Sequence, residues 1–243
     1  MEKILVKIAP AAGLISLVLG FVCVWAVTGY APVEKVQGPV QKLMYLHVAA
    51  AIVSYAGVGL AAFGGGMYLW KQQPQWDRMG KAGAELGLIL SAVVLITGPL
   101  WAKPIWGIWW VWDARLTFTL LLFLILVAYF MVRSLVPGDQ GARFAAVVGI
   151  LALVDVPFVK IAAEKFRTLH PVGVVKGGMT QEMGLTLTLS VITMFVFFVY
   201  LVGKRLEVSL LEERLSSLHE AADADGTPAP LGERYGTESP HRG

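Results

Sequence analysis

Long apolar runs separated by short polar connections dominate the chain from about residue 8 to residue 203. None of the runs has the two-residue alternation that is typical of a half-buried strand. A helix needs about 20 apolar residues to cross the roughly 30 Å of hydrocarbon in a bilayer. The pattern therefore predicts an all-α, polytopic membrane protein with six transmembrane helices. We place them at residues 8–28, 43–70, 83–101, 116–136, 144–162 and 184–203.

Composition agrees with a membrane protein and excludes several other classes. The chain is 56% hydrophobic and 15% charged, whereas soluble proteins carry about 25% charged residues. Its single cysteine allows no internal disulfide and no redox pair. The net charge of +3 forms no basic stripe, so we expect no nucleic-acid partner. The first apolar run exceeds the roughly 7–15 residues of a cleavable signal peptide, so we interpret it as a span.

Six spans place both termini on one side of the membrane. Lys and Arg are slightly more numerous on that side, and the positive-inside rule then predicts cytoplasmic termini. The connections 29–42, 102–115 and 163–183 would face outward. We expect a membrane domain at 1–203 and a cytoplasmic tail at 204–243. The tail would begin as a short helix, either a surface helix or a docking helix, and end as a disordered Pro/Gly-rich segment.

A tryptophan-rich segment at residues 101–117 is the strongest functional signal. Tryptophan favours the headgroup region, but a membrane belt explains only one or two at a helix end. Here four tryptophans stand within seven positions and are followed by an acid and a base. If the segment is helical, Trp106, Trp110 and Asp113 share one face, and Trp109 and Trp112 form the neighbouring face. Such an aromatic shelf at the outer surface suits a large flat ligand such as a porphyrin.

Two histidines share the outward side with this shelf, by the parity of the connections alone. His47 lies near the start of the second span and His170 lies in the last outward connection. Imidazole is a common axial ligand of haem iron, whereas zinc usually takes three or four protein ligands. We therefore interpret His47 and His170 as a pair of iron ligands for haem, although each alone is also typical of a hydrogen-bonded interface residue.

The haem propionates require cations, and two candidates flank the site. Lys42 precedes His47 by five residues, and Arg115 follows the shelf; either one is also typical of a cation that reaches toward the headgroups. Asp113 either caps the fourth span or orients Arg115 and the indoles, and both roles are compatible. The full set of candidate haem-contacting residues is Lys42, Trp106, Gly107, Trp109, Trp110, Trp112, Asp113 and Arg115.

One acid lies inside a predicted span without an obvious role. Asp155 stands in the fifth span, and an ionisable residue at such a depth indicates function by default. Thr97 and Ser91 are candidate donors to its carboxyl group. The pattern does not decide between this hydrogen-bonded arrangement and a protonated acid.

At these residues the sequence resembles a known family. Trp-Gly-Ile-Trp-Trp-Val-Trp-Asp at 106–113 is similar to the "WWD" signature of membrane haem-handling proteins. The flanking Trp101-Ala-Lys-Pro, Asp113-Ala-Arg-Leu-Thr, Tyr45-Leu-His-Val and Thr168-Leu-His resemble haem exporter protein C of cytochrome c maturation. The resemblance covers residues 8–203 and leaves out the tail.

The resemblance implies a haem-binding protein of the bacterial inner membrane, not an enzyme acting alone. It implies haem b held at the periplasmic face by two histidines, which correspond to His47 and His170. It also implies association with subunits of an ATP-binding-cassette (ABC) transporter and with a small single-span subunit. The haem would pass to a membrane-anchored haem chaperone.

Two other functions stay open at the level of sequence. A bis-histidine haem b subunit of an electron-transfer complex is the first, but such proteins usually bury their ligands within the spans, and here both histidines are expected in outer connections. The second is a permease subunit whose aromatic segment only anchors the interface. That function predicts no bound chromophore.

Overall fold

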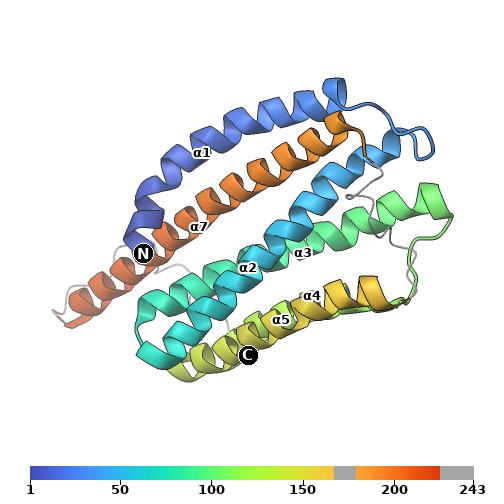
Figure 1. Cartoon of the computed structure of the whole chain (residues 1–243). Coiled ribbons are helices and arrows are strands. Elements are labelled where there is room, and N and C mark those ends of the chain that lie inside the picture. The colour runs from blue at the N-terminus through green and yellow to red at the C-terminus, as the bar shows by residue number, and fades with distance from the viewer. Residues whose placement is uncertain (167–178, 225–243) are drawn as a thin grey trace, which may run out of the picture. The chain divides into compact units, whose positions relative to one another are not determined.

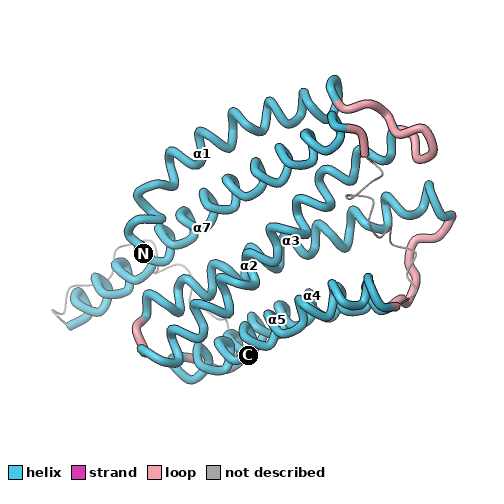
Figure 2. The backbone as a smooth tube through the Cα atoms, in the orientation of Figure 1, coloured by secondary structure: helices cyan, strands magenta, loops and turns pink. Residues whose placement is uncertain are grey.

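The computed structural model describes residues 1–166 and 179–224 of the chain. The chain divides into two compact units, Met1–Leu206 and Glu207–Gly243. Within the described residues every regular element is a helix, and no strand is present (Figure 1). Irregular backbone is confined to connections at the ends of the helices (Figure 2).

The described residues contain six helices that are long and apolar enough to cross a membrane. The predicted all-α class with six transmembrane helices is therefore confirmed. The elements are α1 (Glu2–Trp25), the π-helical turn η1 (Ala26–Tyr30), the 3₁₀ turn η2 (Pro39–Lys42), α2 (Leu43–Lys71), α3 (Pro74–Trp106), α4 (Ala114–Leu135), α5 (Gly138–Lys165) and α7 (Gln181–Ala224).

Two helices extend well beyond the spans that hydropathy predicts. α3 begins at Pro74, where a proline without an N–H group fits the first helical turn. α7 continues past the end of its apolar run, through charged sequence, to Ala224. Hydropathy detects only the part of a helix that suits hydrocarbon, and backbone hydrogen bonding continues beyond it. The assignment of 204–243 to a cytoplasmic tail stays a prediction.

α2 and α3 pack with their backbones in close contact. A methyl group added to Gly64 of α2 would lie 2.5 Å from the nitrogen of Gly80 in α3, and one on Gly57 would lie 2.8 Å from the Cα atom of Gly87. Small residues allow such an approach between transmembrane helices, where packing rather than the hydrophobic effect drives association. This tight pair holds the start of α2 against the end of α3.

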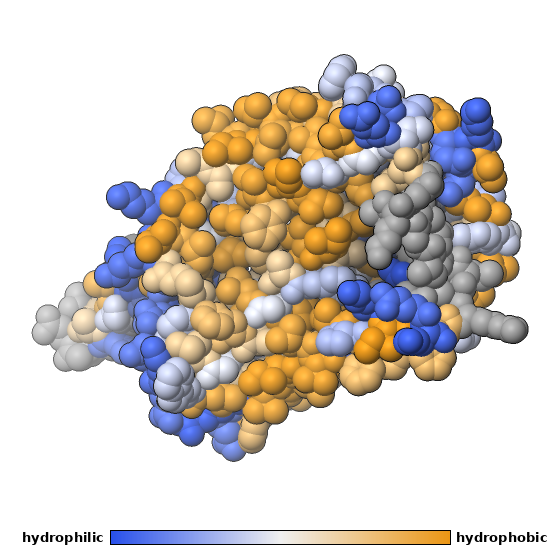
Figure 3. All heavy atoms as spheres, in the orientation of Figure 1, coloured by the Kyte–Doolittle hydropathy of each residue, from blue (hydrophilic) through white to orange (hydrophobic). Residues whose placement is uncertain are grey.

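Three ion pairs join helices at the end of the unit where α1 and α3 begin. Arg78 binds Glu2 of α1 at 2.7 Å, and Arg205 of α7 binds Glu85 at 2.7 Å. The third pair joins Asp77 of α3 to Arg133 of α4 at 2.6 Å. On the face shown in Figure 3, apolar side chains cover the middle of the unit and hydrophilic ones lie toward its ends, as expected for a bilayer-spanning bundle.

Candidate functional site

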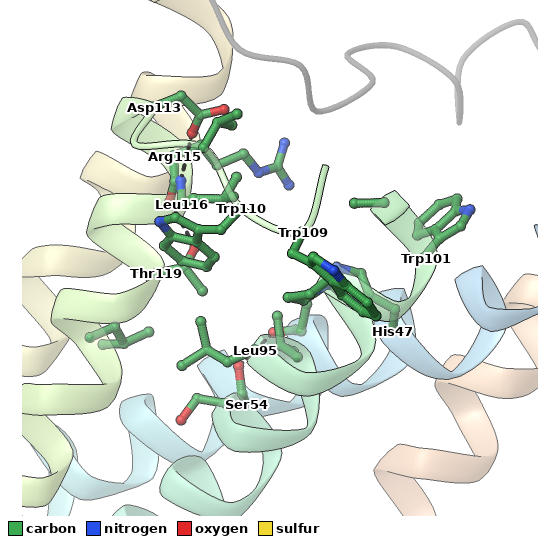
Figure 4. Close-up of a pocket in the computed structure, with 18 of the residues that line it drawn as sticks. His47, Ser54, Leu95, Trp101, Trp109, Trp110, Asp113, Arg115, Leu116 and Thr119 are labelled. Atoms are coloured by element: carbon green, nitrogen blue, oxygen red, sulfur yellow. Dashed lines mark hydrogen bonds between the residues drawn. The ribbon is translucent and has the colours of Figure 1, made fainter. Parts of the chain in front are cut away.

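A cavity opens at the end of the first unit where α2 begins and α3 ends (Figure 4). Its empty space, including the part open to solvent, is about 980 Å³. The lining comes from α2, from the second half of α3, from the connection to α4 and from the first turns of α4. Most of it is apolar or aromatic.

The connection between α3 and α4 carries the tryptophans across the mouth of this cavity. α3 ends at Gly107, whose positive φ of 75° places it in the left-handed region that glycine tolerates best. α4 begins after Asp113, whose Oδ1 accepts from the Leu116 N–H at 2.8 Å. The condition under which the tryptophans would share helical faces therefore does not hold for 107–113, because a glycine ends one helix there and a capping acid starts the next.

The tryptophans of the segment have different environments as a result. Trp106, Trp109 and Trp110 line the cavity. Trp112 is 76% exposed and lies outside the lining, although its ring packs edge-to-face on Trp110 with centroids 5.6 Å apart. Trp101, on α3, also lines the cavity, and its side chain is buried. A continuous helical face would have grouped these residues differently.

His47 lies inside α2 rather than in a connection, and its side chain is buried. Its Nδ1 is 2.9 Å from the hydroxyl oxygen of Thr97 on α3. The edge of the imidazole packs against Trp101, with ring centroids 5.9 Å apart and planes at 67°. Both histidines were expected in outer connections, which disfavoured an electron-transfer subunit. For His47 this expectation is wrong.

The charged candidates separate into those at the cavity and those away from it. Arg115 lines the cavity, and its guanidinium extends toward the space between Trp110 and Trp109 (Figure 4). Asp113 also lines the cavity while it caps α4. The structure does not bring Lys42 to this site, because its ammonium group donates to the Thr28 carbonyl at 3.1 Å.

Two further candidates remain, of which one is described by the structure and the other is not. Gly107 shapes the backbone at the end of α3 but is not part of the lining. His170, the second predicted iron ligand, lies outside the described residues. Within residues 1–166 and 179–224, no three histidine, cysteine or acidic side chains gather as a metal-binding group.

The cavity fits a large aromatic ligand, and the imidazole of His47 contributes to its lining. Its aromatic lining offers flat contact surfaces, and Arg115 offers a cation for an acidic group. The Nε1–H group of Trp110 is buried and has no hydrogen-bond partner among the described residues, and such a group is costly unless something satisfies it. This donor set suits haem, for which the protein supplies only axial ligands.

Sequence reasoning missed the part of the lining that descends between the spans. Ser54 and Tyr55 on α2 and Ser91 and Thr97 on α3 line or approach the cavity one to two turns below its mouth. Their polar side chains within apolar runs could have indicated them, since such side chains tend to face the bundle interior. Gly98, which contacts the His47 ring, gave no comparable signal.

The expected donors to Asp155 bind elsewhere. The Ser91 hydroxyl donates to the Leu88 carbonyl at 2.9 Å, and the Thr97 hydroxyl donates to the Val93 carbonyl at 2.7 Å. Asp155 is buried, and its Oδ2 has no hydrogen-bond partner in the structure.

Comparison with known proteins agrees with the resemblance seen in the sequence. The sequence model of the family Heme exporter protein C matches residues 1–221. The Heme exporter protein C of Haemophilus influenzae is 31% identical over 213 residues, which cover 85% of this chain and 86% of that protein. The protein of the same name from Bradyrhizobium diazoefficiens is 32% identical over 77% of this chain and 73% of its own length.

A more distant relative is a cytochrome c biosynthesis ccmC-like mitochondrial protein of Arabidopsis thaliana. It is 27% identical over 225 residues, which cover 88% of this chain and 84% of that protein. The match to the family spans all six membrane helices and the tryptophan segment between α3 and α4. The chain belongs to the Heme exporter protein C family.

Proposed function

We propose that this chain binds haem in the cavity lined by His47 and the tryptophan segment, and that it delivers the haem for cytochrome c maturation. The observation that carries the proposal is the convergence of His47, Trp109, Trp110 and Arg115 on one cavity. Family membership supports a role in haem handling, and the six apolar helices support a multipass protein of the bacterial inner membrane.

Each group at the cavity has a role that its chemistry supports. The His47 imidazole supplies one axial nitrogen, and His170 supplies the second from the connection after α5. Trp109 and Trp110 cover the flat face of the ligand. Arg115 binds a propionate, since its planar guanidinium matches a carboxylate with two parallel hydrogen bonds. Two strong axial ligands keep the iron unreactive during transfer.

The partners and the orientation are part of the same proposal. The cavity faces the periplasm, and the termini face the cytoplasm. The chain acts within a complex that includes ABC transporter subunits and a small single-span subunit, and a membrane-anchored haem chaperone receives the haem. A carrier must release its ligand, so moderate affinity suits the function better than very tight binding. The chain itself performs no covalent chemistry.

The electron-transfer alternative retains one favourable observation. His47 is on a helix and faces the bundle interior, as ligands of haem b subunits usually do. The family assignment favours haem handling instead, since the relatives carry the names of haem exporters and cytochrome c biosynthesis proteins. Fast reduction of the bound haem by a quinol would favour electron transfer.

The absorption spectrum of the purified protein tests the proposal. The parent protein, produced with ample haem, is expected to show a six-coordinate, low-spin spectrum. His47→Ala is expected to lose that spectrum, because an axial nitrogen is removed, and His170→Ala is expected to do the same. His219→Ala is the matched control, since His219 lies far along α7 in the second unit. An unchanged spectrum in His47→Ala would overturn the proposed site.

A further inference from the structure

The imidazole of His47 is enclosed by three residues of one helix face on α3. Thr97 lies 2.9 Å from its Nδ1, Gly98 leaves open the space beside its Cε1, and the Trp101 ring packs against it at a steep angle. These residues occupy positions i, i+1 and i+4 of α3, so they lie on adjoining parts of one face. The tight glycine-mediated packing of α2 on α3 holds the two sides of this arrangement together.

The hydrogen bonds of Thr97 determine which imidazole nitrogen carries the proton. A threonine hydroxyl has one proton and two acceptor positions. Thr97 gives its proton to the Val93 carbonyl at 2.7 Å. Its oxygen then acts as the acceptor in the 2.9 Å contact with His47, so the proton of the imidazole lies on Nδ1. In a neutral imidazole this places the lone pair on Nε2.

Gly98 leaves the space that the ring needs in this orientation. A methyl group at Gly98 would lie 3.3 Å from the Cε1 atom of His47 and 3.9 Å from its Nδ1. The first distance is tighter than an ordinary van der Waals contact, so a side chain there would displace the imidazole. Trp101 limits rotation of the ring on another edge. Both contacts act on the orientation of the ring.

We infer that Thr97 and Gly98 are positioning residues that present the Nε2 atom of His47 to the ligand. This inference rests on the proposed function, because it assigns His47 as an iron ligand. Thr97 fixes the tautomer, and Gly98 fixes the place of the ring. A partner of the non-ligating nitrogen typically also increases the basicity of the ligating one, and its removal costs about 10- to 100-fold in affinity for the metal.

Thr97→Val tests the tautomer, because valine keeps the shape of threonine and removes the acceptor. We expect haem affinity to fall by roughly tenfold or more and the reduction potential of the bound haem to rise, since the imidazole becomes a weaker donor. Thr97→Ser is expected to restore both. Thr186→Val is the matched control: Thr186 is also buried and also donates to a carbonyl four residues earlier, at 2.8 Å, but it lies on α7 and not beside His47 on α3.

The haem-free protein gives an independent readout. With only four histidines in the chain, ¹⁵N-histidine labelling should resolve the signal of His47. It is expected to be protonated at Nδ1 in the parent and in Thr97→Ser, and to shift toward protonation at Nε2 in Thr97→Val. Protonation at Nε2 in the parent protein would overturn the inference, whatever the effect of the variants on haem.

Gly98→Ala tests the position of the ring. Alanine is a better helix former than glycine by about 1 kcal/mol, so a purely structural role predicts equal or higher thermal stability and unchanged haem affinity. The inference predicts weaker haem binding without loss of stability. If His47→Ala abolishes the low-spin spectrum while Thr97→Val and Gly98→Ala bind haem like the parent, the inference fails and the proposed function stands. If His47→Ala leaves the spectrum unchanged, the proposed function itself fails.

Discussion

Trp110 and Trp112 stand two residues apart in the sequence, but only one of them lines the cavity. Trp110 is half-buried and contributes to the lining, whereas the Trp112 ring is largely in contact with solvent or lipid. Their edge-to-face contact makes Trp112 a neighbour of the site rather than a wall of it. The repeated tryptophans in the sequence suggest equal roles for the two residues. Their different environments predict instead that Trp110 contributes more to ligand binding than Trp112.

We predict that Trp110→Ala weakens haem binding by roughly tenfold, because a stacked aromatic contact contributes about 0.5–1.5 kcal/mol beyond the area that it buries. Trp112→Ala, the matched control, should change the affinity by a much smaller factor. Haem titration of the two purified variants, followed by absorption, measures the difference. Equal losses in both variants would mean that the cavity does not hold the ligand.

Arg115 is the one predicted cation that the described structure brings to the cavity. We predict that Arg115→Ala lowers the affinity for haem by about tenfold, since a charge-assisted hydrogen bond contributes roughly 1.5–3 kcal/mol. The parent protein and the Arg115→Ala variant should bind haem dimethyl ester, which has no propionate charge, with the same affinity. A parallel loss for the ester would show that Arg115 supports the fold of the site rather than the propionate.

At the scale of elements, the α2–α3 pair decides where His47 meets Thr97. The pair depends on glycines whose missing side chains let the two backbones touch. Its glycines are not equivalent, because a methyl group on Gly64 would meet α3 and one on Gly66 would meet nothing within 4 Å. The two positions lie half a turn apart on the same helix.

We predict that Gly64→Ala lowers the unfolding free energy by about 1–3 kcal/mol, which is typical of an overpacked core. Gly66→Ala should be neutral or slightly stabilising, since alanine is the better helix former. Thermal unfolding in detergent compares the two variants with the parent. If Gly64→Ala is as stable as Gly66→Ala, the close packing of the two helices is not required.

At the scale of the whole molecule, orientation in the membrane follows from six helices and a small excess of cations. The connection after α1 and the connection after α2 must lie on opposite sides of the bilayer. Lys35 stands in the first connection and Lys71 at the end of α2, and both side chains are exposed. The single native cysteine, Cys23, is half-buried in α1, with its Sγ 3.3 Å from Ser190 Oγ.

We predict that a membrane-impermeant maleimide labels Lys35→Cys in intact cells, in a Cys23→Ser background. Lys71→Cys should be labelled only after the membrane is opened, because the proposal places that end in the cytoplasm. Cys23→Ser without an added cysteine is the unlabelled control. The reverse pattern would invert the proposed orientation and turn the cavity toward the cytoplasm.

The sequence by itself determined the helical class and the six spans, and it predicted that His47 and the tryptophan segment lie on the same side of the membrane. These follow from the length of the apolar runs and the parity of the crossings, both of which are local properties of the chain. Asp113 was also readable as a helix cap, because capping depends on the residue and its next three neighbours.

Only the tertiary structure decided which of these residues line the cavity. It separated Trp110 from Trp112, took Lys42 away to the Thr28 carbonyl and brought Thr97 and Gly98 against His47. The reason is physical: the break at Gly107 and the close packing of α2 on α3 set directions and contacts between residues about 50 positions apart. No periodicity within a single segment encodes contacts between two different helices.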